Sequence, residues 1–319
     1  MNPDVVAGIS TLDREGILSQ QQVAVLRPIA EGRRLSVHYE LRFLLYVGVL
    51  LLTAGVGALI EQNLDDISPV AIAFGIGIAA ASCLAWVQRK APSFSWGSAA
   101  STHLAFDYVL LLGVLLASAD IAYVEAQFTP LGEHWSWHLF WMSLFMAGLA
   151  LRYDSRVVFS LALSTFAAWR GISASTLGGN LLWSPGTTRT NAIICGVVFV
   201  LLGLALLYWN KKEHFEPVAS FAGWLLVLSS LFSGSFGVYG PSFRIALLLA
   251  GGGLAVYAFS RLHFWLFVMG VLGAYAGMSI IAVEALHGEI TISMWFFVTS
   301  LASLFGLTRA YRIFSEATS

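Results

Sequence analysis

The stretch from Leu41 to Pro69, LRFLLYVGVLLLTAGVGALIEQNLDDISP, decides the fold of this chain. Its first part, residues 41–60, contains a single charged residue, Arg42, and is otherwise mostly apolar. A helix needs about 20 such residues to cross the hydrocarbon core of a bilayer. A short acidic turn follows and closes on Ser68 and Pro69, which are typical of the start of a new helix. The stretch therefore predicts a membrane-spanning helix, a turn and a second helix.

The composition extends this prediction to the whole chain. Of the 319 residues, 58% are hydrophobic and only 11% are charged, and the mean hydropathy is +0.77. A soluble domain carries about 25% charged residues, so this chain cannot cover its own surface in water. We therefore expect an all-α polytopic membrane protein whose solvent is lipid. The net charge of −1 gives no basic field for nucleic acid, and we expect no nucleic-acid partner.

Ten apolar segments approach the length of a membrane span. They are 41–60, 70–87, 103–123, 137–151, 157–170, 192–209, 218–236, 243–259, 263–283 and 291–308. The fourth and fifth are short and are separated only by residues 152–156, so they either turn tightly or form a re-entrant pair, which would leave eight spans. We predict a transmembrane helical domain of about ten spans over residues 41–319.

Residues 1–40 precede the first span and are polar enough to lie in the cytosol. Ser19 is a good N-cap for a helix that Pro28 limits or kinks. We predict a cytosolic helical segment that rests on the membrane surface, with a partner-docking module as the alternative. The segment has no early apolar core typical of a cleavable signal, so the first span is expected to act as the insertion signal.

The distribution of lysine and arginine predicts the orientation. With ten spans and a cytosolic N-terminus, fourteen of the seventeen lie on the cytosolic side, and only Arg170, Arg189 and Arg244 lie outside. The cytosolic set is Arg14, Arg27, Arg33, Arg34, Arg42, Arg89, Lys90, Arg152, Arg156, Lys211, Lys212, Arg261, Arg309 and Arg312. Because cytosolic loops collect positive charge, we expect an even number of spans with both termini in the cytosol. A re-entrant pair would preserve this pattern.

Two features indicate how the spans are related and packed. Residues 48–54, GVLLLTA, resemble residues 113–119, GVLLASA, which suggests parallel repeats of a helical hairpin. Small residues at four-residue spacing, such as Ala71, Gly75 and Ala79 in the second span, let helix backbones approach closely. Gly270, Gly273 and Gly277 give the ninth span a similar face, and we expect close helix contacts at both.

His103, Asp107 and Asp120 are the candidate polar site in the membrane. A carboxylate inside the bilayer is costly, so it usually faces a cavity or a partner. Within segment 103–123, Asp107 lies about one turn from the cytosolic end and Asp120 about one turn from the outer end. His103 and Asp107 are four residues apart and share a helix face, which fits either an interfacial ion pair or a proton- or ion-coupled site.

The outer acidic turn, with Glu61, Asn63, Asp65 and Asp66, is a second candidate site. Asp66 or Ser68 can cap the following helix, and that capping role is the simpler interpretation. Weak binding of a divalent cation is the alternative, because hard cations take clustered oxygens.

His134 and His138 are a weak candidate metal pair, since they are four residues apart among Trp135, Trp137 and Trp141. Two imidazoles alone do not make a metal site, and tryptophan gathers at bilayer interfaces in any case. Cys83 and Cys195 lie in apolar runs without any CxxC spacing, so we expect free thiols and no cofactor.

Three stretches of the sequence resemble a family of bacterial predicted membrane proteins, domain of unknown function 2157. They are Gly16-Ile-Leu-Ser-Gln-Gln21, the span from Gly48 through the turn Asn63-Leu-Asp65, and the span from Gly113 through Gln127. Leu64 stands where the family pattern has Trp, so no aromatic role of the turn is implied. The resemblance implies a multi-span bacterial membrane protein of unassigned activity and supplies no catalytic residues.

Three function classes follow from these observations. The first, which we expect, is transport or handling of a small molecule or lipid, and the alternative is a structural or accessory subunit of a larger membrane complex. An intramembrane enzyme ranks last, because the sequence has no nucleophile–base or metal signature. The expected location is the bacterial cytoplasmic membrane. The expected partners are membrane lipids and, in addition, other membrane proteins or further copies of this chain.

Overall fold

The computed structural model describes residues 12, 19, 38–62, 68–97, 104–129, 134, 136–172, 186–237, 239–286 and 288–318. Across these residues the chain is helical, as the composition predicts, and no strand occurs in them. In chain order the helices are α3 (His38–Gln62), α4 (Pro69–Lys90), α5 (Leu104–Phe128), α6 (Trp137–Tyr153), α7 (Arg156–Trp169), α9 (Gly186–Tyr208), η2 (Glu213–Phe215), α10 (Glu216–Gly234), α11 (Gly240–Ser260), α12 (Phe264–Ala285) and α13 (Glu289–Thr318).

Each of the ten apolar segments coincides with one of these α-helices. Seven helices among the described residues are long and apolar enough to cross a membrane: α4, α5, α9, α10, α11, α12 and α13. The hairpin of α6 and α7 is short, with 17 and 14 residues, or about 25 and 21 Å at 1.5 Å per residue. Both are shorter than a hydrocarbon core of about 30 Å. The ten-span count and the eight-span alternative therefore stay predictions, as do the orientation of the termini and the parallel repeats.

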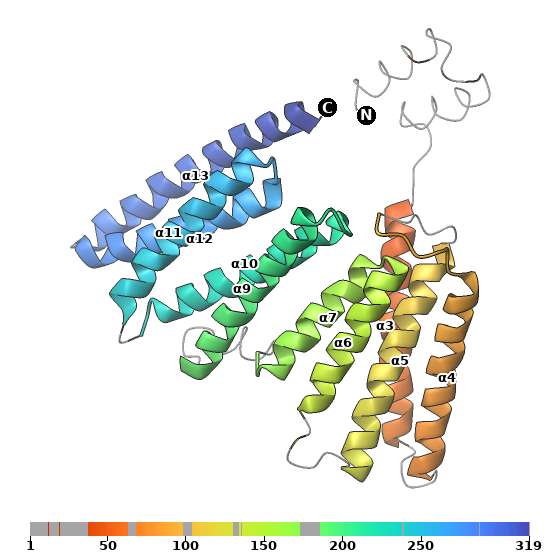
Figure 1. The fold of residues 1–319 in the computed structure, drawn as a ribbon. Helices are drawn as coiled ribbons and strands as arrows, with labels where there is room; N and C mark the ends of the chain where they lie inside the picture. The colour runs from red at the N-terminus through yellow and green to blue at the C-terminus, as the bar shows by residue number, and fades with distance from the viewer. Residues whose placement is uncertain are drawn as a thin grey trace.

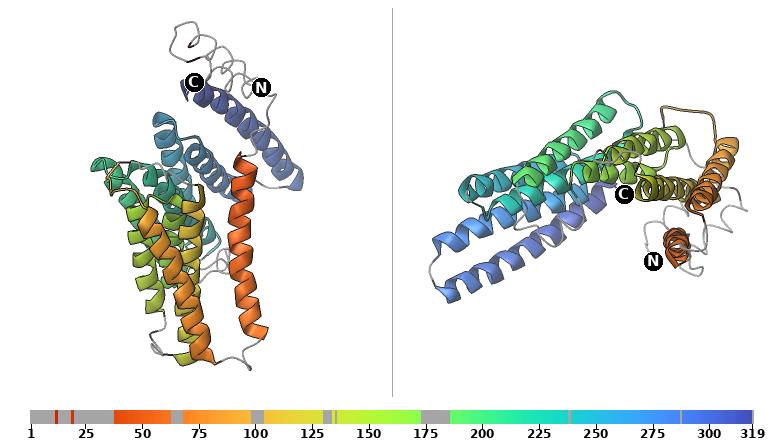
Figure 2. Two further views of the ribbon diagram at one scale, coloured as in Figure 1. Left: turned by 90° about the vertical axis from the view of Figure 1, so that its right-hand side faces the viewer. Right: turned by 90° about the horizontal axis from the view of Figure 1, so that it is seen from below.

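The helices form two groups (Figures 1 and 2). Helices α3 to α7 stand side by side in one group, and α9 to α13 form a second group that is tilted relative to the first. Helix α3 stands apart from its neighbours in Figure 2 and makes its main contacts with α5. The predicted cytosolic segment 1–40 lies outside the described residues, apart from Leu12, Ser19 and the start of α3.

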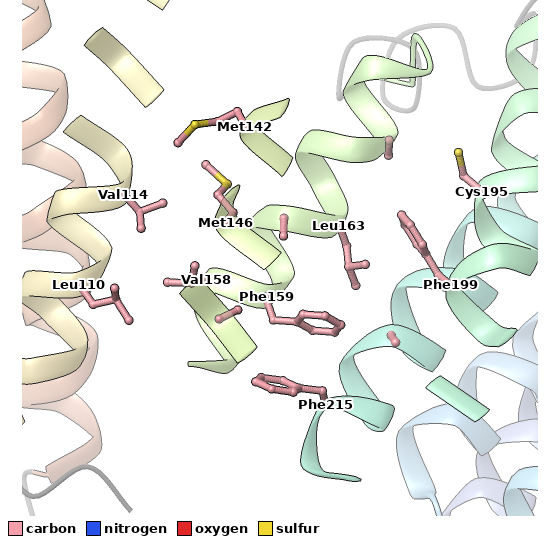
Figure 3. Packing of buried hydrophobic residues seen from close by; sticks show 14 of the residues in the cluster. Leu110, Val114, Met142, Met146, Val158, Phe159, Leu163, Cys195, Phe199 and Phe215 are labelled. Atoms are coloured by element: carbon pink, nitrogen blue, oxygen red, sulfur yellow. The ribbon is translucent and has the colours of Figure 1, made fainter. Parts of the chain in front are cut away.

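A hydrophobic core joins the two groups through α5, α6, α7, α9 and α10. Figure 3 shows Leu110 and Val114 on the α5 side of this core and Cys195 and Phe199 on the α9 side. The rings of Phe159 and Phe215 have centroids 4.7 Å apart, so α7 contacts the segment that begins α10. The other members of the core include Val87, Phe106, Met142, Met146, Ala150, Val158, Ala162, Leu163, Ala167, Ile172, Ala192, Ala219 and Leu226.

Glycine allows α11 and α12 in the second group to pack backbone against backbone. A methyl group on Gly251 of α11 would lie 2.3 Å from the backbone nitrogen of Ala274 in α12. Gly270, Gly273 and Gly277 are all buried in α12, which confirms the close contact predicted for this face. Because lipid tails are as apolar as leucine, this close approach supplies packing that the hydrophobic effect cannot.

The same prediction is wrong for Ala71, Gly75 and Ala79 of α4. Ala71, Gly75 and Ala79 are exposed, and a methyl group on Gly75 would meet no described atom within 4 Å. Helix α4 instead buries Ile72, Ile76, Ala80 and Val87. The larger apolar side chains fill the space toward α5, so these small residues face outward.

Helix α5 is longer than its apolar segment, so Asp120 lies further from the end of the helix than from the end of the segment. The segment was expected to end at Tyr123, one turn after Asp120, but the helix continues to Phe128. Residues 124–128 continue the helix, and the backbone N–H of Thr129 donates to the Glu125 carbonyl at 2.9 Å at its end. Asp120 is therefore eight residues, or about 12 Å, from the outer end of α5.

Candidate functional site

A groove between α4 and α5 holds Asp120 and is the first candidate site. It has a volume of about 420 Å³ and is open on one side. Its walls are apolar except for the carboxylate, and they consist of Ala73, Phe74, Gly77, Ile78, Ala81, Val124 and Asp120. The two helices position it directly, since α4 and α5 pack along their lengths.

The carboxylate of Asp120 is incompletely satisfied in this groove. Its Oδ1 atom is buried and has no hydrogen-bond partner among the described residues. Gly77 makes room for it, because a methyl group at that position would lie 3.1 Å from Oδ2. Tyr123, one helical turn further along α5, also has a buried hydroxyl without a partner in the described part of the chain. Unpaired buried polar groups are uncommon, and they mark a place where a ligand or ion can supply the missing partner.

The depth of Asp120 makes this unpaired oxygen more significant. Helix α5 spans 25 residues, and Asp120 lies four residues, or about 6 Å, beyond its middle residue. A carboxylate at the centre of a membrane-spanning helix costs about 2.5–3.5 kcal/mol on insertion scales. The group can therefore be protonated and donate a hydrogen bond, or it can pair with a cation or donor that enters the groove.

The other two residues of the predicted membrane site are not brought to Asp120. Asp107 lies in the first turn of α5, half-buried and engaged in an interaction of its own. It is thirteen residues from Asp120, or about 20 Å along the helix axis. His103 lies outside the described residues, so its expected pairing with Asp107 stays a prediction.

The structure provides little test of the acidic turn or the histidine pair. Asn63, Asp65 and Asp66 lie outside the described residues, and so does the side chain of Glu61 at the end of α3. Pro69 begins α4 as predicted, whereas Ser68 makes no capping hydrogen bond with its side chain.

His134 is exposed, and His138 is partly buried in the first turn of α6 with an interaction of its own. Within the described ranges, no three His, Cys, Asp or Glu side chains are grouped in a way that could hold a metal ion. The histidine pair therefore gains no further ligand from the described part of the fold.

A buried ionic cluster of Asp154, Lys212 and His214, which we name the Asp154 cluster, is a second feature of interest. Lys212 Nζ lies 3.0 Å from Asp154 Oδ1, and the two side chains are only 1% and 5% exposed. His214 Nε2 lies 2.5 Å from the same oxygen, but not in the direction that a hydrogen bond requires. The cluster joins the α6–α7 turn to the segment between α9 and α10.

Backbone geometry and aromatic rings hold the Asp154 cluster in place. Asp154 and Lys212 both have a left-handed backbone, with φ of 64° and 51°, which lets each chain reverse direction tightly. The Lys212 amide donates to the Trp96 carbonyl at 2.8 Å, and its ammonium lies 5.4 Å from the centre of the Phe94 ring. These contacts bring a third segment, residues 91–97, onto the same cluster.

Another buried carboxylate lies close by in sequence. Glu216 is 3% exposed at the start of α10, where the helix dipole favours an anion, and it accepts a hydrogen bond from Ser220 Oγ at 2.6 Å. The buried Asp154 and Glu216 carboxylates each need a partner, because an unpaired charge in the interior is very unfavourable. Lys212 is the partner of Asp154, and Ser220 is the partner of Glu216. The Asp154 cluster therefore fixes how three loops meet.

The three arginines that fall outside in the predicted topology are structurally tied to neighbouring elements. Arg170 Nη2 donates to Asn191 Oδ1 at 2.7 Å, while Asn191 Nδ2 donates back to the Arg170 carbonyl at 3.0 Å. Arg244 pairs with Glu284 and donates from Nε to the Ser235 carbonyl at 3.0 Å. The guanidinium of Arg189 lies over the ring of Phe243. These residues bind helix ends to one another.

Comparison with known proteins confirms the resemblance that the sequence suggests. Residues 10–159 match the model of a family described as "Predicted membrane protein (DUF2157)". No curated protein and no solved structure matches the chain.

Proposed function

We propose that this protein, whose residues 10–159 match the DUF2157 family of predicted membrane proteins, handles a lipid or another membrane-soluble small molecule. The observation that carries the proposal is the unpaired Asp120 oxygen in an apolar groove between two candidate membrane spans. The apolar walls fit a hydrocarbon body, and the carboxylate fits a cationic or hydrogen-bond-donating group on it. Asp120 is then the polar contact that selects the ligand.

Replacement of Asp120 by Asn provides the test. The protein is purified in its own lipids, and the molecules retained by the complex are identified and counted by native mass spectrometry. We expect Asp120→Asn to lower retention of one amphiphilic species at least about tenfold, because a hydrogen bond to a charged group contributes about 1.5–3 kcal/mol. An unchanged set of retained molecules would contradict the proposal.

Gly77→Leu and Gly75→Leu form a matched pair for the same measurement. The side chain at position 77 enters the groove beside Asp120, whereas position 75 faces open space among the described atoms. Both variants change one glycine of α4 to the same residue, so their effects on helix insertion are alike. We expect the ligand to be lost from Gly77→Leu and kept by Gly75→Leu.

We further propose that the protein lies in the bacterial cytoplasmic membrane with both termini in the cytosol. The distribution of basic residues supports this orientation. With Cys83 and Cys195 replaced by alanine, we expect a membrane-impermeant maleimide to label Gly237→Cys in intact cells. Lys211→Cys, in the exposed turn at the opposite side, should react only after permeabilisation. The reverse pattern of labelling would invert the topology.

Helix α13 favours a second candidate function, that of an accessory subunit in a larger membrane assembly. The most apolar 18-residue window of this helix contains no buried residue, and Phe297, Leu301 and Phe305 are exposed. Such a face is available to helices of another protein. The purification described above separates the two functions, because an accessory subunit retains a protein partner whether or not Asp120 is replaced.

A further inference from the structure

Residues 91–97, which follow α4, form an ordered surface loop that is fixed at several points. Arg152 Nη1 donates to the Pro92 carbonyl at 3.2 Å, and the Trp96 carbonyl accepts from the Lys212 amide at 2.8 Å. The rings of Phe94 and Trp96 meet edge to face with centroids 4.9 Å apart. The loop is therefore held by the Asp154 cluster and the end of α6.

The aromatic side chains of this loop are nevertheless largely exposed. Phe94 and Trp96 are 45% and 52% exposed, and Trp209, at the end of α9, is 62% exposed. Two large aromatic residues on the fixed loop and one at the end of α9 are therefore exposed instead of packed in the core. Tryptophan in such a position is typical of the interface between lipid headgroups and hydrocarbon.

One exposed cation lies against these rings, and others lie on the adjoining helix ends. Lys211 Nζ lies 4.5 Å from the centre of the Trp96 ring. The end of α4 carries exposed Arg89 and Lys90 and is attached to α6 by a hydrogen bond from Tyr153 to Gln88. The other exposed charges that the described residues give this face are Arg156, which begins α7, and one anion, Glu213.

The electrostatic balance of this surface is clearly positive. Asp154 is paired with Lys212 inside the cluster, so it does not neutralise the exposed cations. Among the described residues, four exposed cations, Arg89, Lys90, Arg156 and Lys211, thus stand against one exposed carboxylate. A fixed basic surface with aromatic neighbours matches an anionic headgroup whose acyl chains lie beside apolar helices.

We propose that this surface, which consists of Arg89, Lys90, Trp96, Arg156 and Lys211, binds the headgroup of an anionic phospholipid from the adjacent leaflet. The cations pair with the phosphate, and the aromatic rings lie at the level of the glycerol backbone. The site is independent of the Asp120 groove, because Asp120 lies toward the opposite end of α5. The proposal of a headgroup site therefore holds even if the Asp120 groove binds no ligand.

The test uses the full-length protein in nanodiscs of phosphatidylcholine that contain a minor fraction of phosphatidylglycerol. Native mass spectrometry gives the ratio of the two lipids retained by the protein. We expect phosphatidylglycerol to be enriched. The double variant with Lys90→Gln and Lys211→Gln should lower this enrichment about fivefold for each cation removed. Added salt should weaken the enrichment in the wild-type protein, because the cations are exposed.

A double variant with Arg261→Gln and Arg309→Gln is the matched control. It removes two exposed cations that the predicted topology places on the same side of the membrane but outside this surface. We expect it to retain phosphatidylglycerol as the wild-type protein does. An equal loss in both double variants, or no enrichment in the wild type, would overturn the proposal. Equal thermal unfolding temperatures of the variants would show that the fold is intact.

Discussion

Replacement of Lys212 by methionine is expected to lower the free energy of unfolding by about 3–5 kcal/mol. The substitution leaves Asp154, whose side chain is 5% exposed, as a buried anion beside a neutral side chain. The desolvation of the carboxylate is then no longer offset by the ammonium 3.0 Å away. The loss is measured as a lower unfolding temperature of the protein in detergent, with tryptophan fluorescence as the readout.

Lys211 provides the control, because it is the adjacent lysine but is exposed. Lys211→Met should change the free energy of unfolding by about 0–1 kcal/mol, as exposed ionic interactions do. Addition of Asp154→Asn to Lys212→Met should restore part of the lost stability, since no buried charge then lacks its partner. Equal effects of the two lysine substitutions would contradict the interpretation of the Asp154 cluster as a buried ion pair.

Gly251→Ala is expected to destabilise the pair of α11 and α12 by about 1–3 kcal/mol. The added methyl group would lie 2.3 Å from the Ala274 nitrogen and 2.8 Å from the Gly270 carbonyl oxygen, both of which are backbone atoms. No flexible side chain can move aside, so the two helices must separate. Unfolding in increasing concentrations of denaturing detergent measures the effect.

The next residue, Gly252, gives a control of opposite sign. A methyl group there meets none of the described atoms within 4 Å, and alanine is the better helix former by about 0.8–1 kcal/mol. Gly252→Ala should therefore leave stability unchanged or raise it slightly. If both alanine variants lowered stability alike, the backbone contact at Gly251 would not be the cause.

The existence of the helices could be predicted well from the sequence, because apolar length is a direct physical requirement for crossing lipid. The ends of helices were less predictable. Residues 124–128 include Glu125 and Gln127, which suggest a loop, yet backbone hydrogen bonding continues the helix through them. The predicted end of this helix was therefore short by five residues, more than one turn.

The Asp154 cluster was not predicted, since its residues are far apart in the sequence and ordinary in their local context. Asp154 lies in a short turn, and Lys212 follows another lysine in what resembles a solvent-exposed basic loop. Only the contact between the two turns distinguishes Lys212, which is buried, from Lys211, which is exposed. The adjacent Asp154-Ser155 pair does signal a helix start, and Ser155 Oγ accepts from the Val158 amide.

The pairing of Asp154 with Lys212 also bears on the modularity of the chain. The family match ends at residue 159, after Asp154 but well before Lys212, and Phe159 itself packs on Phe215. A break at that boundary would separate a buried anion from its cation and one ring from its neighbour. We therefore expect that the matched segment does not fold on its own, because residues outside the match stabilise its C-terminal edge.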